Sequence, residues 1–159
     1  MRPLQQLIDA KPTTVSVGPE DTVFQALTLL AQFDIGALPV LDQGRLVGIF
    51  SERDYARKVI LKGKASKDTT VGEIMSDKVS CVTLSQTVEE CMALMTDKRI
   101  RHLPVLGPGQ EVLGIISIGD LVKETISCAM SVSRIRLSDA DRFSTATLRL
   151  LMVCSNRFW

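Results

Sequence analysis

The sequence is short of the residues on which most catalytic and metal centres depend. Its 159 residues include a single histidine, and aromatic residues make up 4% of the chain. The four cysteines show no C-x-x-C spacing, so they do not indicate a zinc or redox site. The chain also lacks a P-loop and a G-x-S-x-G motif. We therefore expect a protein that is not an enzyme and that binds no metal ion.

The chain has neither a strong charge nor a long apolar run. The net charge is +1, with 45% hydrophobic and 23% charged residues, which is typical of a globular protein. No apolar run approaches the roughly 20 residues of a membrane span, and the start, "MRPLQQLIDA", lacks the apolar core of a secretory signal. Nothing here indicates a membrane or a nucleic-acid partner, and we expect a cytoplasmic location.

A duplicated segment dominates the sequence. Residues 22–41 and 87–106 align with an offset of 65 residues, and both begin with Thr-Val and end with Leu-Pro-Val-Leu. One extra residue in the following turn raises the offset to 66, which aligns "GIFSERD" (48–54) with "GIISIGD" (114–120). An internal repeat of this length predicts two copies of one structural unit.

The pattern of each copy predicts a β-α-β-β-α unit. Apolar residues recur at helical spacing after Thr22 and Thr87, and both threonines suit the N-cap position that precedes a helix. Two short apolar runs predict a hairpin, a polar-faced helix follows at about residues 52–62, and "TVSV" (14–17) predicts a strand before the first helix. A single unit of roughly 50 residues buries little surface, so we expect an α/β (α+β) fold with both units packed as a pseudo-twofold pair.

The same pattern sets the expected boundaries. We expect a first unit at residues 1–62, a lysine-rich linker with a short helical turn at 63–78, a second unit at 79–126 and a C-terminal tail at 127–159. The tail matches no part of the repeat, and its "TATLRLLMV" run suits a helix or a strand equally well. An engineered or out-of-frame terminus stays open as an explanation for it.

The two units together resemble a tandem pair of cystathionine-β-synthase (CBS) domains. The resemblance covers roughly residues 1–126 and rests on the repeat, both "LPVL" strands, the "VGEIM" linker and both "GI-x-S-x-x-D" junctions. The short chain looks like the stand-alone CBS-pair proteins of bacteria. It implies a non-enzymatic regulatory or signal-transduction module that forms a homodimer and acts on an effector protein that the sequence does not identify. It also implies that clefts between the units bind an adenine nucleotide, with AMP first and ADP, ATP, NAD(H) or S-adenosylmethionine as the other candidates.

The resemblance assigns ligand contacts to both Ser-x-x-Asp junctions. The aspartate of the family motif binds ribose hydroxyls and the serine contacts ribose or phosphate, which implies Ser51 with Asp54 in one cleft and Ser117 with Asp120 in the other. The chemistry suits these roles, because a carboxylate accepts hydrogen bonds from two hydroxyls and a helix N-terminus favours phosphate. The apolar residues that the resemblance implies around adenine are Val15, Val17, Ile49, Val82 and Ile115.

Basic residues distinguish the two expected clefts. Arg53 offers a planar guanidinium to phosphate oxygens. Arg101 and His102 precede the second "LPV", where kinase-regulating relatives place a basic pair beside the nucleotide phosphate. Pseudo-symmetry would bring both residues to Asp54, so we expect the cleft at Asp54 to bind phosphate more strongly than the cleft at Asp120.

Plainer interpretations stand beside each of these roles. Ser-x-x-Asp on its own is more often a capping box than a ribose site, and a lone histidine is more often half-buried and bonded to backbone. The alternative function is therefore a ligand-free structural or dimerisation module.

Overall fold

The computed structural model describes residues 4–9 and 14–136. The chain divides into two compact units, Met1–Thr125 and Ile126–Trp159. Both copies of the repeat lie in the first unit. Helix α5 (Ile118–Arg136) begins there and continues into the segment predicted to be the tail, whereas the "TATLRLLMV" run lies outside the described residues.

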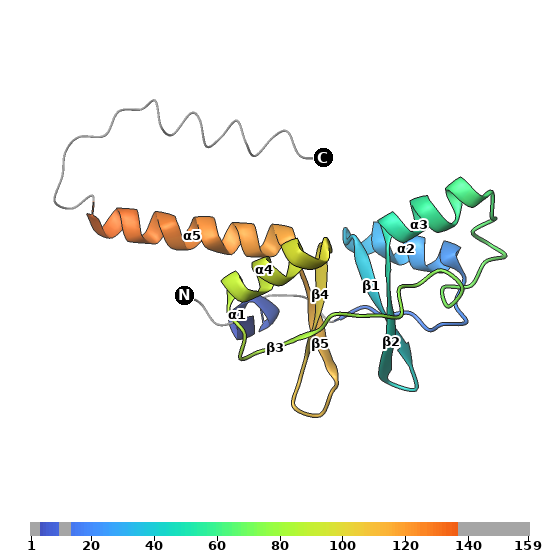
Figure 1. The fold of residues 1–159 in the computed structure, drawn as a ribbon, viewed down its shortest axis with the longest axis horizontal. Helices are drawn as coiled ribbons and strands as arrows, with labels where there is room; N and C mark the ends of the chain where they lie inside the picture. The colour runs from blue at the N-terminus through green and yellow to red at the C-terminus, as the bar shows by residue number, and fades with distance from the viewer. Residues whose placement is uncertain (1–3, 10–13, 137–159) are drawn as a thin grey trace. The chain divides into compact units, whose positions relative to one another are not determined.

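The first copy contains two helices and a hairpin. Helix α2 (Val23–Phe33) leads to strands β1 (Ala37–Asp42) and β2 (Arg45–Ser51), which pair antiparallel (Figure 1). Helix α3 (Glu52–Lys58) follows, and a 3-10 turn, η1 (Ile60–Lys62), completes the span predicted as one helix. The predicted "TVSV" strand is reduced to a single parallel bridge between Val17 and Val40.

The second copy repeats this order. Strand β3 (Val82–Thr83) and helix α4 (Val88–Lys98) precede the hairpin of β4 (His102–Leu106) and β5 (Val112–Ser117), after which α5 begins (Figure 1). Strand β3 pairs parallel with β4, and β4 pairs antiparallel with β5. The mixed α+β architecture predicted from the repeat is confirmed.

The duplication extends to the helix caps. Thr22 and Thr87 each accept a hydrogen bond from the backbone of the residue three positions on, at 3.2 Å in both copies. The side chains of Gln25 and Glu90 accept a bond from the threonine backbone in return, at 2.8 Å. Such reciprocal caps satisfy backbone groups that the first turn of a helix leaves unpaired.

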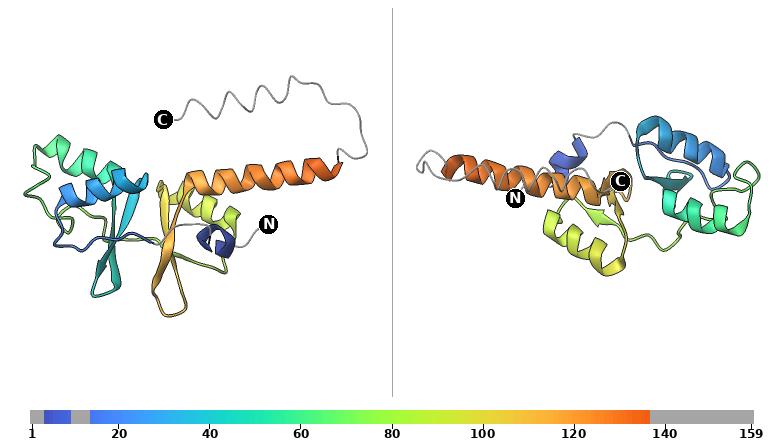
Figure 2. Two further views of the ribbon diagram at one scale, coloured as in Figure 1. Left: turned by 180° about the vertical axis from the view of Figure 1, so that it is seen from behind. Right: turned by 90° about the horizontal axis from the view of Figure 1, so that it is seen from above.

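Each core is completed by the segment that precedes the other copy. Helix α1 (Leu4–Asp9) lies beside the second hairpin (Figure 2), and Leu4 is fully buried in the core of the second copy. Residues 71–76, here called the linker turn, supply Val71 and Ile74 to the core of the first copy. Backbone bonds between Ile49 and Ser76, at 3.0 and 2.9 Å, fix the linker turn to β2.

Glycines at equivalent positions allow α1 to pack on the second copy and the linker turn to pack on the first. A Cβ atom at Gly48 would lie 2.9 Å from Met75 Cγ, and one at Gly114 would lie 3.0 Å from Ile8 Cδ1. We expect Gly48→Ala to lower the free energy of unfolding by about 1 kcal/mol through overpacking, which is a shift of about 3–6 °C in thermal denaturation. Gly18→Ala is the control, because the nearest atom lies 3.6 Å away; an equal loss in both variants would contradict the argument.

No helix in the described part of the chain combines the length and the apolar character needed to cross a membrane.

Candidate functional site

A cavity of about 390 Å³, here called the Asp54 cleft, opens between the two copies of the repeat. The first copy contributes the β2–α3 junction, with Ile49, Ser51, Glu52, Arg53 and Asp54. The second copy contributes residues before β3 and at the start of β4: Lys78, Val79, Ser80, Ile100, Arg101 and His102. The junction and the basic pair, which lie far apart in the sequence, therefore meet at one cavity.

The Ser51–Asp54 junction is a capping box. Asp54 Oδ2 accepts bonds from the Ser51 backbone at 3.1 Å and from the Ser51 hydroxyl at 2.6 Å, while Ser51 Oγ accepts the Asp54 backbone N–H at 3.3 Å. Ser117 and Asp120 repeat this geometry at 2.7, 2.8 and 3.2 Å. The plain interpretation of the motif as a cap is thus confirmed, and the cap uses one oxygen of the Asp54 carboxylate.

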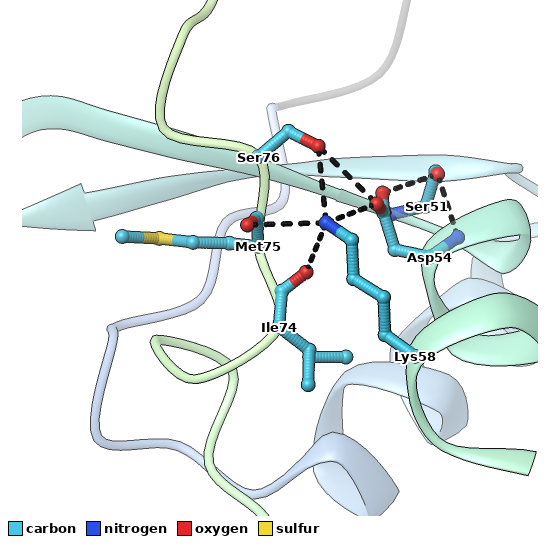
Figure 3. Close-up of polar contacts among 6 residues, drawn as sticks. All are labelled: Ser51, Asp54, Lys58, Ile74, Met75 and Ser76. Atoms are coloured by element: carbon cyan, nitrogen blue, oxygen red, sulfur yellow. Dashed lines mark hydrogen bonds and ion pairs between the residues drawn. The ribbon is translucent and has the colours of Figure 1, made fainter. Parts of the chain in front are cut away.

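The second oxygen of Asp54 faces different partners. Asp54 Oδ1 lies 2.8 Å from the ammonium of Lys58, one turn further along α3, and accepts the Ser76 hydroxyl at 3.2 Å (Figure 3). Lys58 and Ser76 both line the Asp54 cleft. The Asp54 side chain is 13% exposed and lines the cavity, so its carboxylate is largely sheltered from bulk water.

Basic residues outnumber acidic ones around the Asp54 cleft. The basic lining residues are Arg53, Arg57, Lys58, Lys78, Arg101 and His102, against the acidic Glu52 and Asp54. Arg53 donates from Nη1 to the carbonyl of Arg99 at 3.1 Å, which links α3 of the first copy to the end of α4 in the second. Positive charge gathered in a concave site attracts anionic ligands.

A second cavity of about 410 Å³, here called the Asp120 cleft, has a different character. Its charged lining residues are Asp34, Asp120 and Lys123, with His102 shared between both clefts. Apolar and uncharged residues make up the rest: Thr14, Val15, Phe33, Ile35, Gly36, Ala37, Gly114, Ile115 and Ser117. The two copies thus provide two clefts of similar size and unequal charge.

Gly36 allows His102 its position between the clefts. A Cβ atom at Gly36 would lie 3.3 Å from both Cε1 and Nε2 of the imidazole. The equivalent position in the second copy is Arg101. Because Gly36 has no side chain, the first copy leaves room for His102 of the second copy.

Most residues singled out from the sequence line a cleft. Ile49, Ser51, Arg53, Asp54, Arg101 and His102 lie at the Asp54 cleft, and Val15, Ile115, Ser117 and Asp120 lie at the Asp120 cleft. Val17 and Val82 line neither, because they pair with β1 and β4 and their side chains are buried in the two cores. A side chain covered by its own core is not available to adenine, and Ser80, the equivalent of Val15, lines the Asp54 cleft instead.

Several lining residues were missed from the sequence. Arg57 and Lys58 lie three and four positions after Asp54, a spacing that places them on the same helix face and could have identified them. Ser76 and Lys78 belong to the segment interpreted as a polar linker, and no local pattern there indicates a cleft. Lys123 lies at the same distance from Asp120 as Arg57 does from Asp54.

Metal and thiol chemistry find little support in the described residues. No cluster of three or more His, Cys, Asp or Glu side chains within residues 4–9 and 14–136 could hold a metal ion. Burial, with a smaller effect from the Glu90 charge, raises the pKa of the Cys91 thiol to about 11. A thiol that stays protonated at neutral pH is a poor nucleophile, and Cys91 packs in the core of the second copy as a small apolar residue.

Comparison with known proteins identifies the repeat. The family model for the CBS domain matches residues 8–60 and 71–127. The mitochondrial CBS domain-containing protein CBSX3 of Arabidopsis thaliana is 44% identical over 112 residues, or 67% of this chain, and the chain spans 54% of the length of CBSX3. A structure of a protein with CBS domains from Burkholderia ambifaria MC40-6 shares 44% identity with a TM-score of 0.76, over 91% of this chain and 100% of that one. The CBS domain pair of protein MJ0100, solved with 5′-methylthioadenosine and S-adenosyl-L-methionine, shares 26% identity with a TM-score of 0.69, over 78% of this chain and 99% of that one.

Proposed function

The chain belongs to the CBS domain family as a tandem pair, and on that basis we propose that it is a regulatory module that binds an adenine nucleotide in the clefts between its two domains. The observation that carries the proposal is the Asp54 cleft. It combines a carboxylate, a helix N-terminus and six basic side chains contributed by both domains. The complex of MJ0100 with two adenosine derivatives supports a ligand of this class.

The lining of the Asp54 cleft matches the parts of AMP. Asp54 is the acceptor for the ribose hydroxyls, and Arg53, Arg101 and His102 are the partners of the phosphate. Ile49 and Ile100 offer apolar surface to the purine. AMP is the first candidate, and ADP, ATP, NAD(H) and S-adenosylmethionine share the adenosine part that these residues address.

Binding between two domains provides a regulatory mechanism. A ligand that contacts both domains stabilises the arrangement in which its contacts are best, and it shifts the population only by its differential affinity. In this proposal the chain acts as a homodimer on an unidentified effector protein in the cytoplasm and catalyses no reaction itself.

A ligand-free structural module is the second candidate, and one observation favours it. Both oxygens of Asp54 already bond to groups of the chain, namely Ser51, Lys58 and Ser76. A carboxylate whose oxygens are both hydrogen-bonded within the chain can have a purely structural role, without binding a ligand.

Nucleotide analogues separate the two candidates. We expect AMP at about 100 times its dissociation constant to raise the free energy of unfolding by about 2.7 kcal/mol, measured by thermal denaturation. Calorimetry should show weaker binding of 2′-deoxy-AMP, which lacks one ribose hydroxyl, and of GMP, whose base differs. Equal stabilisation by all three nucleotides, or by none, would favour the structural module.

A further inference from the structure

The ammonium of Lys58 joins two parts of the chain that are distant in sequence. Lys58 Nζ lies 2.8 Å from Asp54 Oδ1 and donates to the carbonyl of Ile74 at 2.7 Å and to that of Met75 at 3.3 Å (Figure 3). Ile74 and Met75 belong to the linker turn, which lies at the start of the second CBS match and packs on the first domain. A single side chain therefore contacts both the carboxylate of the Asp54 cleft and the linker.

The surroundings of this contact make it more than a surface ion pair. Exposed pairs contribute little because two mobile side chains must be ordered in water. Here the linker turn is fixed to β2 by the backbone bonds between Ile49 and Ser76, and its carbonyls direct the ammonium. The Lys58 side chain is 36% exposed and that of Asp54 is 13% exposed, so the pair is partly shielded from solvent.

The hydrogen bonds of Asp54 indicate how a ribose would enter. Ser51 supplies two donors to Oδ2, and Lys58 and Ser76 supply one each to Oδ1, which together use the roughly four acceptor positions of a carboxylate. A ribose hydroxyl must therefore replace one donor. The Ser76 hydroxyl, at 3.2 Å, is a neutral donor whose oxygen accepts a long bond of 3.4 Å from Lys58, whereas the ammonium is charged and held by two carbonyls.

From this geometry we propose that Lys58 is a positioning residue that presents Asp54 Oδ1 to the ribose and couples occupancy of the Asp54 cleft to the linker turn. The proposal rests on the proposed function, because it concerns the same cleft. The ligand replaces Ser76, a residue of the linker turn itself, and then contacts Lys78 to Ser80, which follow it directly. Binding at Asp54 is thus transmitted to the first residues of the second CBS domain.

The coupling belongs to one cleft. The position in the second copy that is equivalent to Lys58 is Glu124, which carries the opposite charge and is 8% exposed. A glutamate cannot donate to carbonyls, so helix α5 carries no counterpart of the Lys58 ammonium at this position. In this proposal, ligand binding at the Asp54 cleft affects the linker turn through Lys58, and binding at the Asp120 cleft does not.

The test measures ribose recognition at the Asp54 cleft alone. In the full chain carrying Asp120→Ala, calorimetry compares adenosine with 2′-deoxyadenosine. We expect Lys58→Met to weaken adenosine binding by about tenfold, the lower range for a hydrogen bond to a charged group, and to change 2′-deoxyadenosine binding by less than about threefold. Lys58→Arg, which keeps the charge and the donors, should restore part of the discrimination.

Lys64→Met is the matched control. Lys64 holds Glu73 of the linker turn at 2.8 Å, makes no contact with Asp54 and does not line the cleft. Its loss should loosen the turn and leave the preference for adenosine unchanged. Hydrogen exchange of residues 71–80 supplies a second readout: adenosine should slow exchange there in the parent and in Lys64→Met, and not in Lys58→Met.

Each outcome has a distinct meaning. If the parent binds no adenosine, both the proposed function and this inference fail. If the parent prefers adenosine and Lys58→Met keeps the same preference, only the inference fails. An equal loss in Lys64→Met would also overturn it, because docking of the turn would then determine ribose affinity. Should circular dichroism show that Lys58→Met does not fold, Lys58→Gln takes its place with the same expected result.

Discussion

Replacing Asp54 with alanine should remove one of two adenosine sites and leave the other unchanged. Under the proposed function, the variant loses the acceptor for the ribose hydroxyls at one cleft, at a cost of about 1.5–3 kcal/mol in binding, or roughly 10–150-fold in affinity. Titration calorimetry should show the stoichiometry falling from two adenosine molecules per chain to one. The reciprocal variant, Asp120→Ala, should empty the other cleft, and the double variant should bind none.

Folding must be separated from binding in this test, because both aspartates also cap a helix. Loss of a cap costs about 1 kcal/mol of stability, so both single variants should unfold at a somewhat lower temperature. Glu52→Ala is the control at the Asp54 cleft, since Glu52 lines the cavity and lies on the same first turn while Asp54 keeps its cap. If both aspartate variants bind adenosine as the parent does, the carboxylates serve the helices alone.

The repeat explains how much of the fold could be predicted. Capping at Thr22 and Thr87, the two hairpins and the helices beginning after Ser51 and Ser117 all follow from local patterns that occur twice. Agreement between the copies made each pattern more reliable than it would be alone. The strand predicted over "TVSV" was the weak point, because a two-residue pairing in one copy and a single bridge in the other leave almost no periodicity to detect.

Long-range placement explains what the sequence could not predict. Val17 and Val82 lie two positions after the cleft residues Val15 and Ser80, and only the pairing with β1 and β4 determines that they point into the cores. Helix α1 packs at Gly114 of the second copy, and the linker turn packs at Gly48 of the first. These are tertiary contacts, which local secondary-structure propensity does not predict. The spacing of Lys58 from Asp54 could have placed it at the cleft, but its contact with the linker turn could not be predicted, because Ile74 and Met75 contribute backbone carbonyls, which carry no sequence signal.

The excess of basic residues at the Asp54 cleft predicts that AMP and adenosine bind there with different affinities. Arg53 and Arg101 line the Asp54 cleft, whereas Lys123 lines the Asp120 cleft together with two aspartates, Asp34 and Asp120. We expect AMP to bind the Asp54 cleft at least about tenfold more tightly than adenosine, because charge-assisted bonds to phosphate are strong where water is partly excluded. At the Asp120 cleft, the two ligands should bind with similar affinity.

Removing the arginines should abolish this preference. Arg53→Ala and Arg101→Ala should each weaken AMP binding by about tenfold, and the double variant by up to about 100-fold, while adenosine binding changes by less than about twofold. Arg45→Ala is the matched control, because Arg45 is an exposed residue of β2 that lines neither cleft. Calorimetry at about 0.05 M and about 0.5 M salt adds an independent criterion, since screening weakens contacts with phosphate and leaves an uncharged nucleoside almost unaffected. An arginine whose loss leaves the ratio of AMP to adenosine affinity unchanged, at both salt concentrations, lies in the solvated rim of the cleft and does not contact the phosphate.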